Sequence, residues 1–159
     1  METDHMDFEC MTCGKMFERT WFDISRTRER VRYKSPTAVD EVEISFGDGI
    51  GVFCSRACLE GGRAAVMQEQ GVPIPTDRPD IGPIEACARC SGPVDMSDWH
   101  LTFSEGKLEG EGGSVATLEF DYLAVVCKRC SPSQSVGGTV ADEVMEQPKA
   151  ESCEKVPAR

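Results

Sequence analysis

The chain has 159 residues, of which 40% are apolar and 7% aromatic, and its formal net charge is −11. Such an acidic protein repels phosphate backbones, which excludes nucleic-acid binding through its overall field. No run approaches the roughly 20 apolar residues of a membrane span. Residues 1–20 lack a basic leader followed by an apolar segment. We therefore expect a cytoplasmic protein without membrane contact.

Eight of the nine cysteines form four tight pairs, and long intervals separate consecutive pairs. A turn that holds two cysteines three or four positions apart aims both sulfurs at one point, and two such turns complete a tetrahedron around a metal ion. The spacing predicts two four-thiolate sites. The ligands of the first are Cys10, Cys13, Cys54 and Cys58, and those of the second are Cys87, Cys90, Cys127 and Cys130.

Disulfides and iron are the competing interpretations of these cysteines. Thiols stay reduced in the cytosol, which favours metal over disulfides. A rubredoxin-like iron site uses the same pair of turns, and the sequence does not separate iron from zinc. We expect two structural Zn²⁺ ions, because a doubled structural module needs no redox partner. Metal loading makes the expected net charge about −15.

The predicted elements follow the cysteine pairs along the chain. A strand is expected at Trp21–Ser25, a tight turn at Gly47–Gly49 and a helix at Leu59–Gln70 that ends at Gly71. In the second half a strand at Trp99–Phe103 leads into a flexible glycine-rich loop at Gly106–Gly113. Alternating apolar residues predict further strands around Val42–Phe46 and Leu118–Tyr122.

The two halves align with each other, which predicts an internal duplication. Each has a Cys-x-x-Cys turn, a tryptophan eight or nine residues later, and a β-rich run before its second cysteine pair. The fold class is therefore a small, metal-stapled, β-rich (α+β) protein with one helix, after the second cysteine pair of the first unit. The expected parts are a zinc module at 1–70, a proline-rich linker at 71–86, a second zinc module at 87–131 and a disordered tail at 132–159, which contains Cys153.

The segment Phe53-Cys54-Ser55-x-x-Cys58, followed by a predicted helix, resembles the FCS-type, treble-clef zinc fingers. The second unit looks like a zinc ribbon. The resemblance covers the cysteine turns and little else. It implies a fold and a metal but transfers no function.

A basic strand alternates five cations with other residues, at Arg26, Arg28, Arg30, Arg32 and Lys34. Period two places them on one face, where they could bind phosphates or an acidic protein segment. The structural interpretation is a hairpin turning at Ser35–Ala38, in which Arg30 faces Glu43, Arg32 faces Glu41 and Lys34 faces Val39. Either interpretation leaves Arg26 and Arg28 unpaired, which makes them the stronger candidates for partner contacts.

Two tryptophans and two histidines also need an interpretation. Trp21 and Trp99 are expected in the core beside the metal sites, although exposed rings could stack on bases or peptides. His5 and His100 are not needed as ligands, because four thiolates are available for each site. Lysine or arginine lies in or beside all four cysteine turns, where a cation would offset thiolate charge.

These features favour a non-enzymatic zinc-binding adaptor or regulatory protein that binds a protein partner through its zinc modules. A catalytic zinc keeps an open position, whereas four cysteines close each site, and no small-molecule substrate is expected. One alternative is a nucleic-acid or nucleoprotein binder that uses the basic strand Arg26–Lys34. A second is a redox-responsive zinc protein. The acidic surface could also mimic nucleic acid toward a basic partner.

Overall fold

The computed structural model describes residues 8–17, 19–111 and 113–130 of the chain. The predicted tail at 132–159, with Cys153, lies outside these residues, as does His5. Within the described ranges, no helix has the length and apolar character needed to cross a bilayer.

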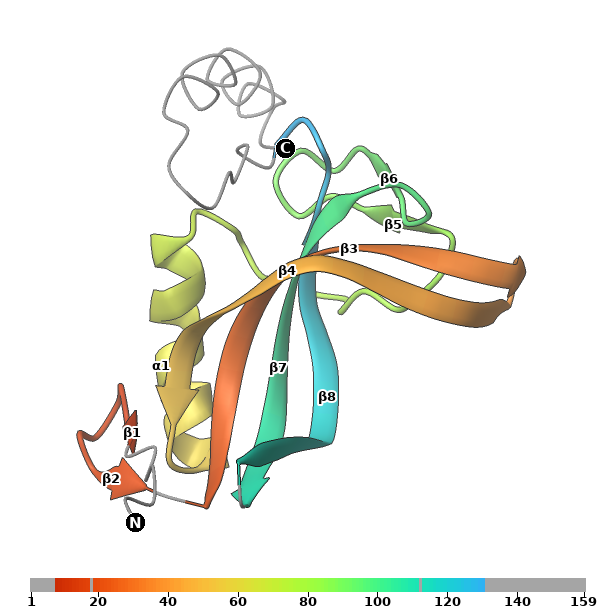
Figure 1. The fold of residues 1–159 in the computed structure, drawn as a ribbon. Helices are drawn as coiled ribbons and strands as arrows, with labels where there is room; N and C mark the ends of the chain where they lie inside the picture. Colours follow the sequence, from red (N-terminus) through yellow and green to blue (C-terminus); the bar gives the residue numbers. More distant parts are fainter. Residues whose placement is uncertain (1–7, 18, 112, 131–159) are drawn as a thin grey trace, which may run out of the picture.

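A four-stranded antiparallel sheet forms the centre of the protein, in the order β4-β3-β7-β8 (Figure 1). Its strands are β3 (Thr20–Ser35), β4 (Ala38–Phe53), β7 (His100–Glu111) and β8 (Ser114–Val126). Two short hairpins carry the first cysteine pair of each half. They consist of β1 (Phe8–Glu9) with β2 (Met16–Phe17), and β5 (Ile84–Ala86) with β6 (Pro93–Asp95).

The two predicted zinc units contribute two strands each to this sheet. Strand β3 pairs with β7 over ten residues, from Thr20 opposite Glu109 to Glu29 opposite His100. Each half runs in the same order, a short cysteine-bearing hairpin followed by two long strands, and the first half adds a helix. Whether this order reflects a duplication stays a prediction.

Helix α1 (Arg56–Glu69) lies where the sequence predicts a helix, and it begins three residues earlier than expected. Ser55 caps its N-terminus, because the hydroxyl oxygen accepts a hydrogen bond from the backbone N–H of Cys58. Gly71, at φ +71°, follows the last turn in the left-handed conformation that glycine tolerates. The buried residues Leu59, Val66 and Met67 belong to the side of the helix that packs in the core.

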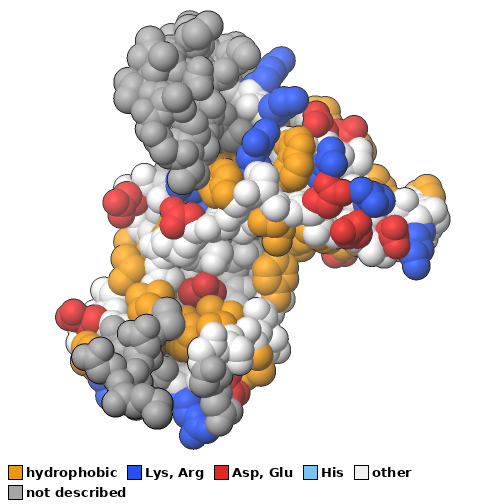
Figure 2. All heavy atoms as spheres, in the orientation of Figure 1, with side chains coloured by type: hydrophobic (Ala, Val, Ile, Leu, Met, Phe, Trp, Pro, Cys, Tyr) orange, Lys and Arg blue, Asp and Glu red, His pale blue; other side chains and the backbone are white. Residues whose placement is uncertain are grey.

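The hairpin of β3 and β4 confirms most of the register predicted for the basic strand. Arg30 lies opposite Glu43, Val31 opposite Val42, and Arg32 opposite Glu41. A register shift near the turn places Tyr33, not Lys34, opposite Val39, so that part of the prediction is wrong. The end of this hairpin extends beyond β7 and β8 as an arm (Figure 1), and charges of both signs are interspersed over it (Figure 2).

Both glycine-rich segments form strands rather than the predicted turn and loop. Gly47 and Gly49 lie within β4, opposite Thr27 and Ser25, and the register shifts next to Gly49, as is common where a glycine interrupts a strand. Gly106 lies within β7, where an added Cβ would approach the backbone oxygen of Glu119 to 2.8 Å. Close strand approach explains this glycine, and among the described residues of this segment the turn lies at Gly113.

The predicted linker lies against the rest of the protein. Val72 is buried, Arg78 contacts the carboxylates of Glu105 and Asp121, and the Tyr33 hydroxyl donates a hydrogen bond to the Gly82 carbonyl oxygen (2.7 Å). These contacts hold the segment along the sheet between α1 and β5.

Candidate metal centres

The first cysteine group lies where the β1–β2 hairpin meets the end of β4 and the start of α1. Cys10 and Cys13 come from the hairpin turn, Cys54 follows β4 directly, and Cys58 lies in the first turn of the helix. The four Sγ atoms all lie within 4.8 Å of one another. These residues could therefore hold one metal ion, as the sequence predicts.

The distances between sulfurs in this group match tetrahedral coordination. Cys13 Sγ lies 3.6 Å from Cys54 Sγ, and Cys54 Sγ lies 3.8 Å from Cys58 Sγ. Sulfurs at about 2.3 Å from a tetrahedral Zn²⁺ are about 3.8 Å apart, whereas a disulfide brings them to about 2.05 Å. All four cysteines of the first group are free thiols.

Backbone contacts fix the first turn against its neighbours. The N–H of Met11 donates to the Val52 carbonyl oxygen (3.0 Å), and the Thr12 hydroxyl donates to the Cys58 carbonyl oxygen (2.7 Å). Behind the turn, Phe8 and Phe17 pack against Trp21, which is only 6% exposed. The prediction that Trp21 belongs to the core beside this site is confirmed.

The second group is built from the β5–β6 hairpin and the chain that follows β8. Cys87, Cys90, Cys127 and Cys130 also bring their sulfurs within 4.8 Å of one another, with 3.8 Å between Cys90 Sγ and Cys127 Sγ. The N–H of Ala88 donates to the Val125 carbonyl oxygen (2.8 Å), which holds this hairpin against β8.

Backbone amides donate hydrogen bonds to the sulfurs of the second group. The amides of Arg89 and Cys127 donate to Cys87 Sγ, at 3.4 and 3.3 Å, and that of Gly92 donates to Cys90 Sγ at 3.4 Å. Cys87, Cys90 and Cys127 are free thiols.

The protonation of the thiols differs within each group. For Cys10, burial opposes ionisation, but hydrogen bonds from the amides of Cys13, Cys54 and Thr12 outweigh it and lower the pKa to about 6. Burial and hydrogen bonds with neighbouring cysteines raise the pKa of Cys54 to about 12. In the second group the pKa of Cys87 is lowered, because backbone amides outweigh burial, and burial raises the pKa of Cys127 to about 11. A metal ion must therefore displace protons, so its binding weakens at low pH.

The basic strand is largely neutralised by acidic neighbours. Arg30 Nε lies 2.6 Å from Glu43, Arg32 contacts both Glu43 and Glu41, and Lys34 lies 3.8 Å from Asp40. Arg26 lies 3.3 Å from Asp48 and donates to the Gln70 side-chain oxygen, so the expectation that it stays unpaired is wrong. The structure thus gives four of the five cations an acidic partner.

Arg28 contacts an aromatic ring. The guanidinium groups of Arg28 and Arg30 lie 5.3 and 4.8 Å from the ring centroid of Trp99. Trp99 is half-buried at the surface, so its assignment to the core is wrong. His100 is buried and its Nδ1 lies 2.8 Å from the Asp98 carbonyl oxygen, outside both cysteine groups.

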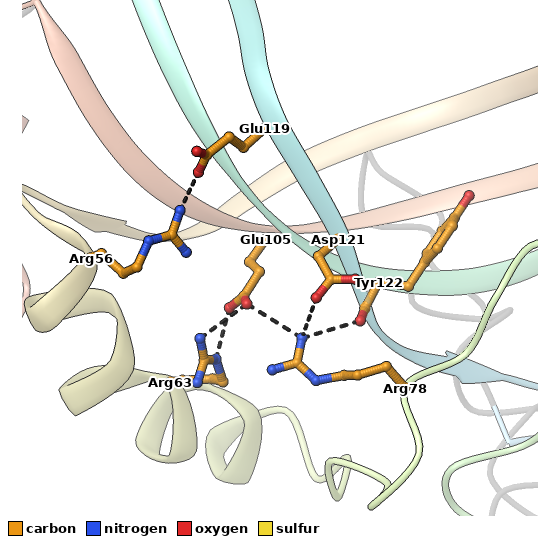
Figure 3. Close-up of polar contacts among 7 residues, drawn as sticks. All are labelled: Arg56, Arg63, Arg78, Glu105, Glu119, Asp121 and Tyr122. Carbon is orange, nitrogen blue, oxygen red and sulfur yellow. Dashed lines mark hydrogen bonds and ion pairs between the residues drawn. The ribbon is translucent and has the colours of Figure 1, made fainter.

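One buried ion-pair cluster has no clear signal in the sequence. Glu105 of β7 is 7% exposed and contacts Arg63 of α1 at 2.7 Å and Arg78 of the linker at 3.3 Å (Figure 3). Arg78 also contacts Asp121 at 3.0 Å, and Arg56 pairs with Glu119. The cluster ties the helix beside the first cysteine group to strands of the second half, across a separation of 42 residues between Arg63 and Glu105.

No protein-family model, curated protein or solved structure matches this chain. Its function therefore has to be argued from its own residues.

Proposed function

We propose that this protein is a non-enzymatic, zinc-binding adaptor that binds an extended segment of a partner protein along strand β8. Zinc at the two cysteine groups supplies stability to the sheet, and the sheet presents the edge strand. The observation that carries the proposal is a row of exposed apolar side chains on that strand. Val115, Leu118 and Phe120 are 54%, 49% and 57% exposed.

Strand β8 is the last strand in the sheet order, so one of its edges faces away from β7. An exposed edge strand with apolar side chains readily pairs with another chain, and proteins that do not use such an edge usually block it. At its far end the same strand already accepts a hydrogen bond from the amide of Ala88, in the turn between β5 and β6. Every residue of β8 from Ser114 to Asp121 is exposed, and this half of the strand extends the same edge.

Charge decides between a second copy and a different partner. Two copies of a chain with a net charge of −11 repel each other at the distance of an interface, whereas a basic partner is attracted. The occupant is therefore an extended segment of a basic protein, with apolar residues to cover Leu118 and Phe120. Nucleic acid fits less well, because most cations of the basic strand have acidic partners.

The test compares two edges of the same sheet. Phe120→Asp alters the proposed edge, and Ile44→Asp is the matched control because Ile44 is 61% exposed on the other edge strand, β4. The full-length protein, purified with its partners from the native host, should return one basic protein at fixed stoichiometry. Phe120→Asp should abolish its recovery and Ile44→Asp should retain it.

Hydrogen exchange on the purified complex should show slowed exchange of the amides in 114–122. Nucleic acid as the only bound component would contradict the proposal, as would self-association of the chain or equal recovery with both variants. Binding that appears only after removal of residues 131–159 would show that this segment covers the edge, and would contradict a free docking strand.

A further inference from the structure

The two cysteine groups differ in how far solvent reaches their sulfurs. In the first group Cys13 is exposed, although Cys10 beside it is buried. In the second group Cys87, Cys90 and Cys130 are all buried and Cys127 is half-buried. Among the eight cysteines of the two groups, Cys13 is therefore the one most open to a small polar oxidant.

The sulfur of Cys54 lies beside that of the exposed Cys13. Cys54 Sγ lies 3.6 Å from Cys13 Sγ, which is close enough to form a disulfide after a small side-chain movement. Cys13 lies in a turn between two short strands, so its side chain can move without displacing the sheet. In the second group three amide hydrogen bonds hold Cys87 and Cys90 in place.

We propose that Cys13 is the site at which peroxides and other small electrophiles modify this protein, and that its oxidation with Cys54 empties the first metal centre while the second stays loaded. The sulfur of Cys13 attacks the O–O bond of the peroxide, forms a sulfenic acid and releases one water. The sulfur of Cys54 then attacks that sulfur, forms the S–S bond and releases a second water. Two thiolates lose two electrons, peroxide gains them, and two protons come from solvent.

Loss of these two ligands leaves Cys10 and Cys58, which are too few to retain a structural zinc ion. The change is local, because the first turn is tied to Val52 and to Cys58 by single hydrogen bonds from Met11 and Thr12. The inference does not depend on strand β8, so it can fail or succeed independently of the adaptor function.

The test uses the full-length, fully reduced protein loaded with zinc. Hydrogen peroxide is added and released zinc is counted with a chromophoric chelator, while peptide mass mapping locates disulfides. We expect one zinc equivalent to leave about tenfold faster than the other, together with a Cys13–Cys54 disulfide. Equal release rates, or a fast phase that maps to the second group, would overturn the proposal.

Two matched variants assign the fast phase. Histidine can bind zinc but cannot form a disulfide, so Cys13→His should slow the fast phase to the rate of the slow one. Cys90→His should leave the fast phase unchanged. Brief alkylation of the zinc-loaded wild type with iodoacetamide gives a second measurement that needs no variant. Cys13 should be labelled first, and labelling that starts in the second group, or a first group that binds no metal, would refute the assignment.

Discussion

The two cysteine groups share a spacing pattern and differ in their surroundings. The first lies between a short hairpin and the start of a helix, and one of its sulfurs is open to solvent. The second is held against β8 by backbone hydrogen bonds, and three of its cysteines are buried. Spacing thus determines which sulfurs can meet, whereas packing determines which of them a reagent can reach.

The largest expected effect comes from removing one ligand of either group. Cys10→Ser and Cys87→Ser should each lower the zinc content by one ion per chain, because three thiolates hold structural zinc far less tightly than four. Structural zinc contributes on the order of 10 kcal/mol of binding free energy, so each variant should also lose cooperative thermal unfolding. Metal analysis and calorimetry would check this. Retention of both zinc ions by Cys10→Ser would show that Cys10 is not a required ligand of the first site.

The ion pair between α1 and β7 measures how strongly the two halves are coupled. Arg63→Met removes the closest partner of buried Glu105 and should lower the free energy of unfolding by about 3 kcal/mol. Arg56→Met breaks the exposed pair with Glu119 and should cost less than about 1 kcal/mol. Denaturant unfolding of the reduced, zinc-loaded proteins compares them. Equal losses in the free energy of unfolding would show that the buried ion pair stabilises the protein no more than the exposed one.

Glu29 makes stability depend on pH at the junction between the halves. It is 4% exposed on β3 opposite His100, and burial raises its pKa from 4.5 to about 7, although a hydrogen bond from the Tyr122 hydroxyl partly opposes this. Folding therefore favours the protonated carboxyl of Glu29. The contribution of this group to the free energy of unfolding is fully present below pH 4.5 and is lost as the pH rises through about 7.

Glu29→Gln should therefore gain stability relative to the wild type as the pH rises from 4.5 to 7, by about 2 kcal/mol after allowance for solvent screening. The difference between the two proteins isolates this group from other carboxylates such as Asp23, whose pKa is also raised by burial. Urea titrations at several pH values measure it. A difference that does not change with pH would contradict the assignment.

The smallest predicted effects distinguish two adjacent glycines in α1. An added Cβ at Gly62 would lie 2.6 Å from the Phe53 ring and 2.8 Å from Thr12 Oγ1, against the turn of the first cysteine group. At Gly61 the nearest atom is 3.8 Å away. Gly61→Ala should stabilise the helix by up to about 1 kcal/mol, whereas Gly62→Ala should destabilise the protein by about 1 kcal/mol and loosen the first zinc ion. Melting temperatures and zinc competition would test both, and similar gains from the two changes would contradict the packing described for Gly62.

The sequence predicts those parts of the molecule that local chemistry determines. The cysteine pairs, the helix between Ser55 and Gly71, and the pairs of Arg30 with Glu43 and Arg32 with Glu41 all depend on spacing or on a short turn. The turn predicted at Gly47–Gly49 and the loop predicted from Gly106 are wrong, because a glycine beside a register shift or at a close strand approach looks the same in sequence as one that permits a turn.

The pairing of β3 with β7 could not be predicted from the sequence. These strands lie far apart along the chain, and nothing local specifies that Ile24 lies opposite Glu105. The burial of Glu105 and the exposure of Phe120 both follow from that pairing and from the position of α1. The different accessibility of Cys13 and Cys90 has the same origin, since both belong to Cys-x-x-Cys turns of equal length.

Native mass spectrometry of freshly purified, reduced protein tests the central claim most directly, because it reports the identity and number of bound metal ions on each chain. We predict two zinc ions per chain, and one in Cys10→Ser or in Cys87→Ser. A wild-type chain that carries no metal, or whose mass shows disulfides among the eight paired cysteines under reducing conditions, would contradict this account.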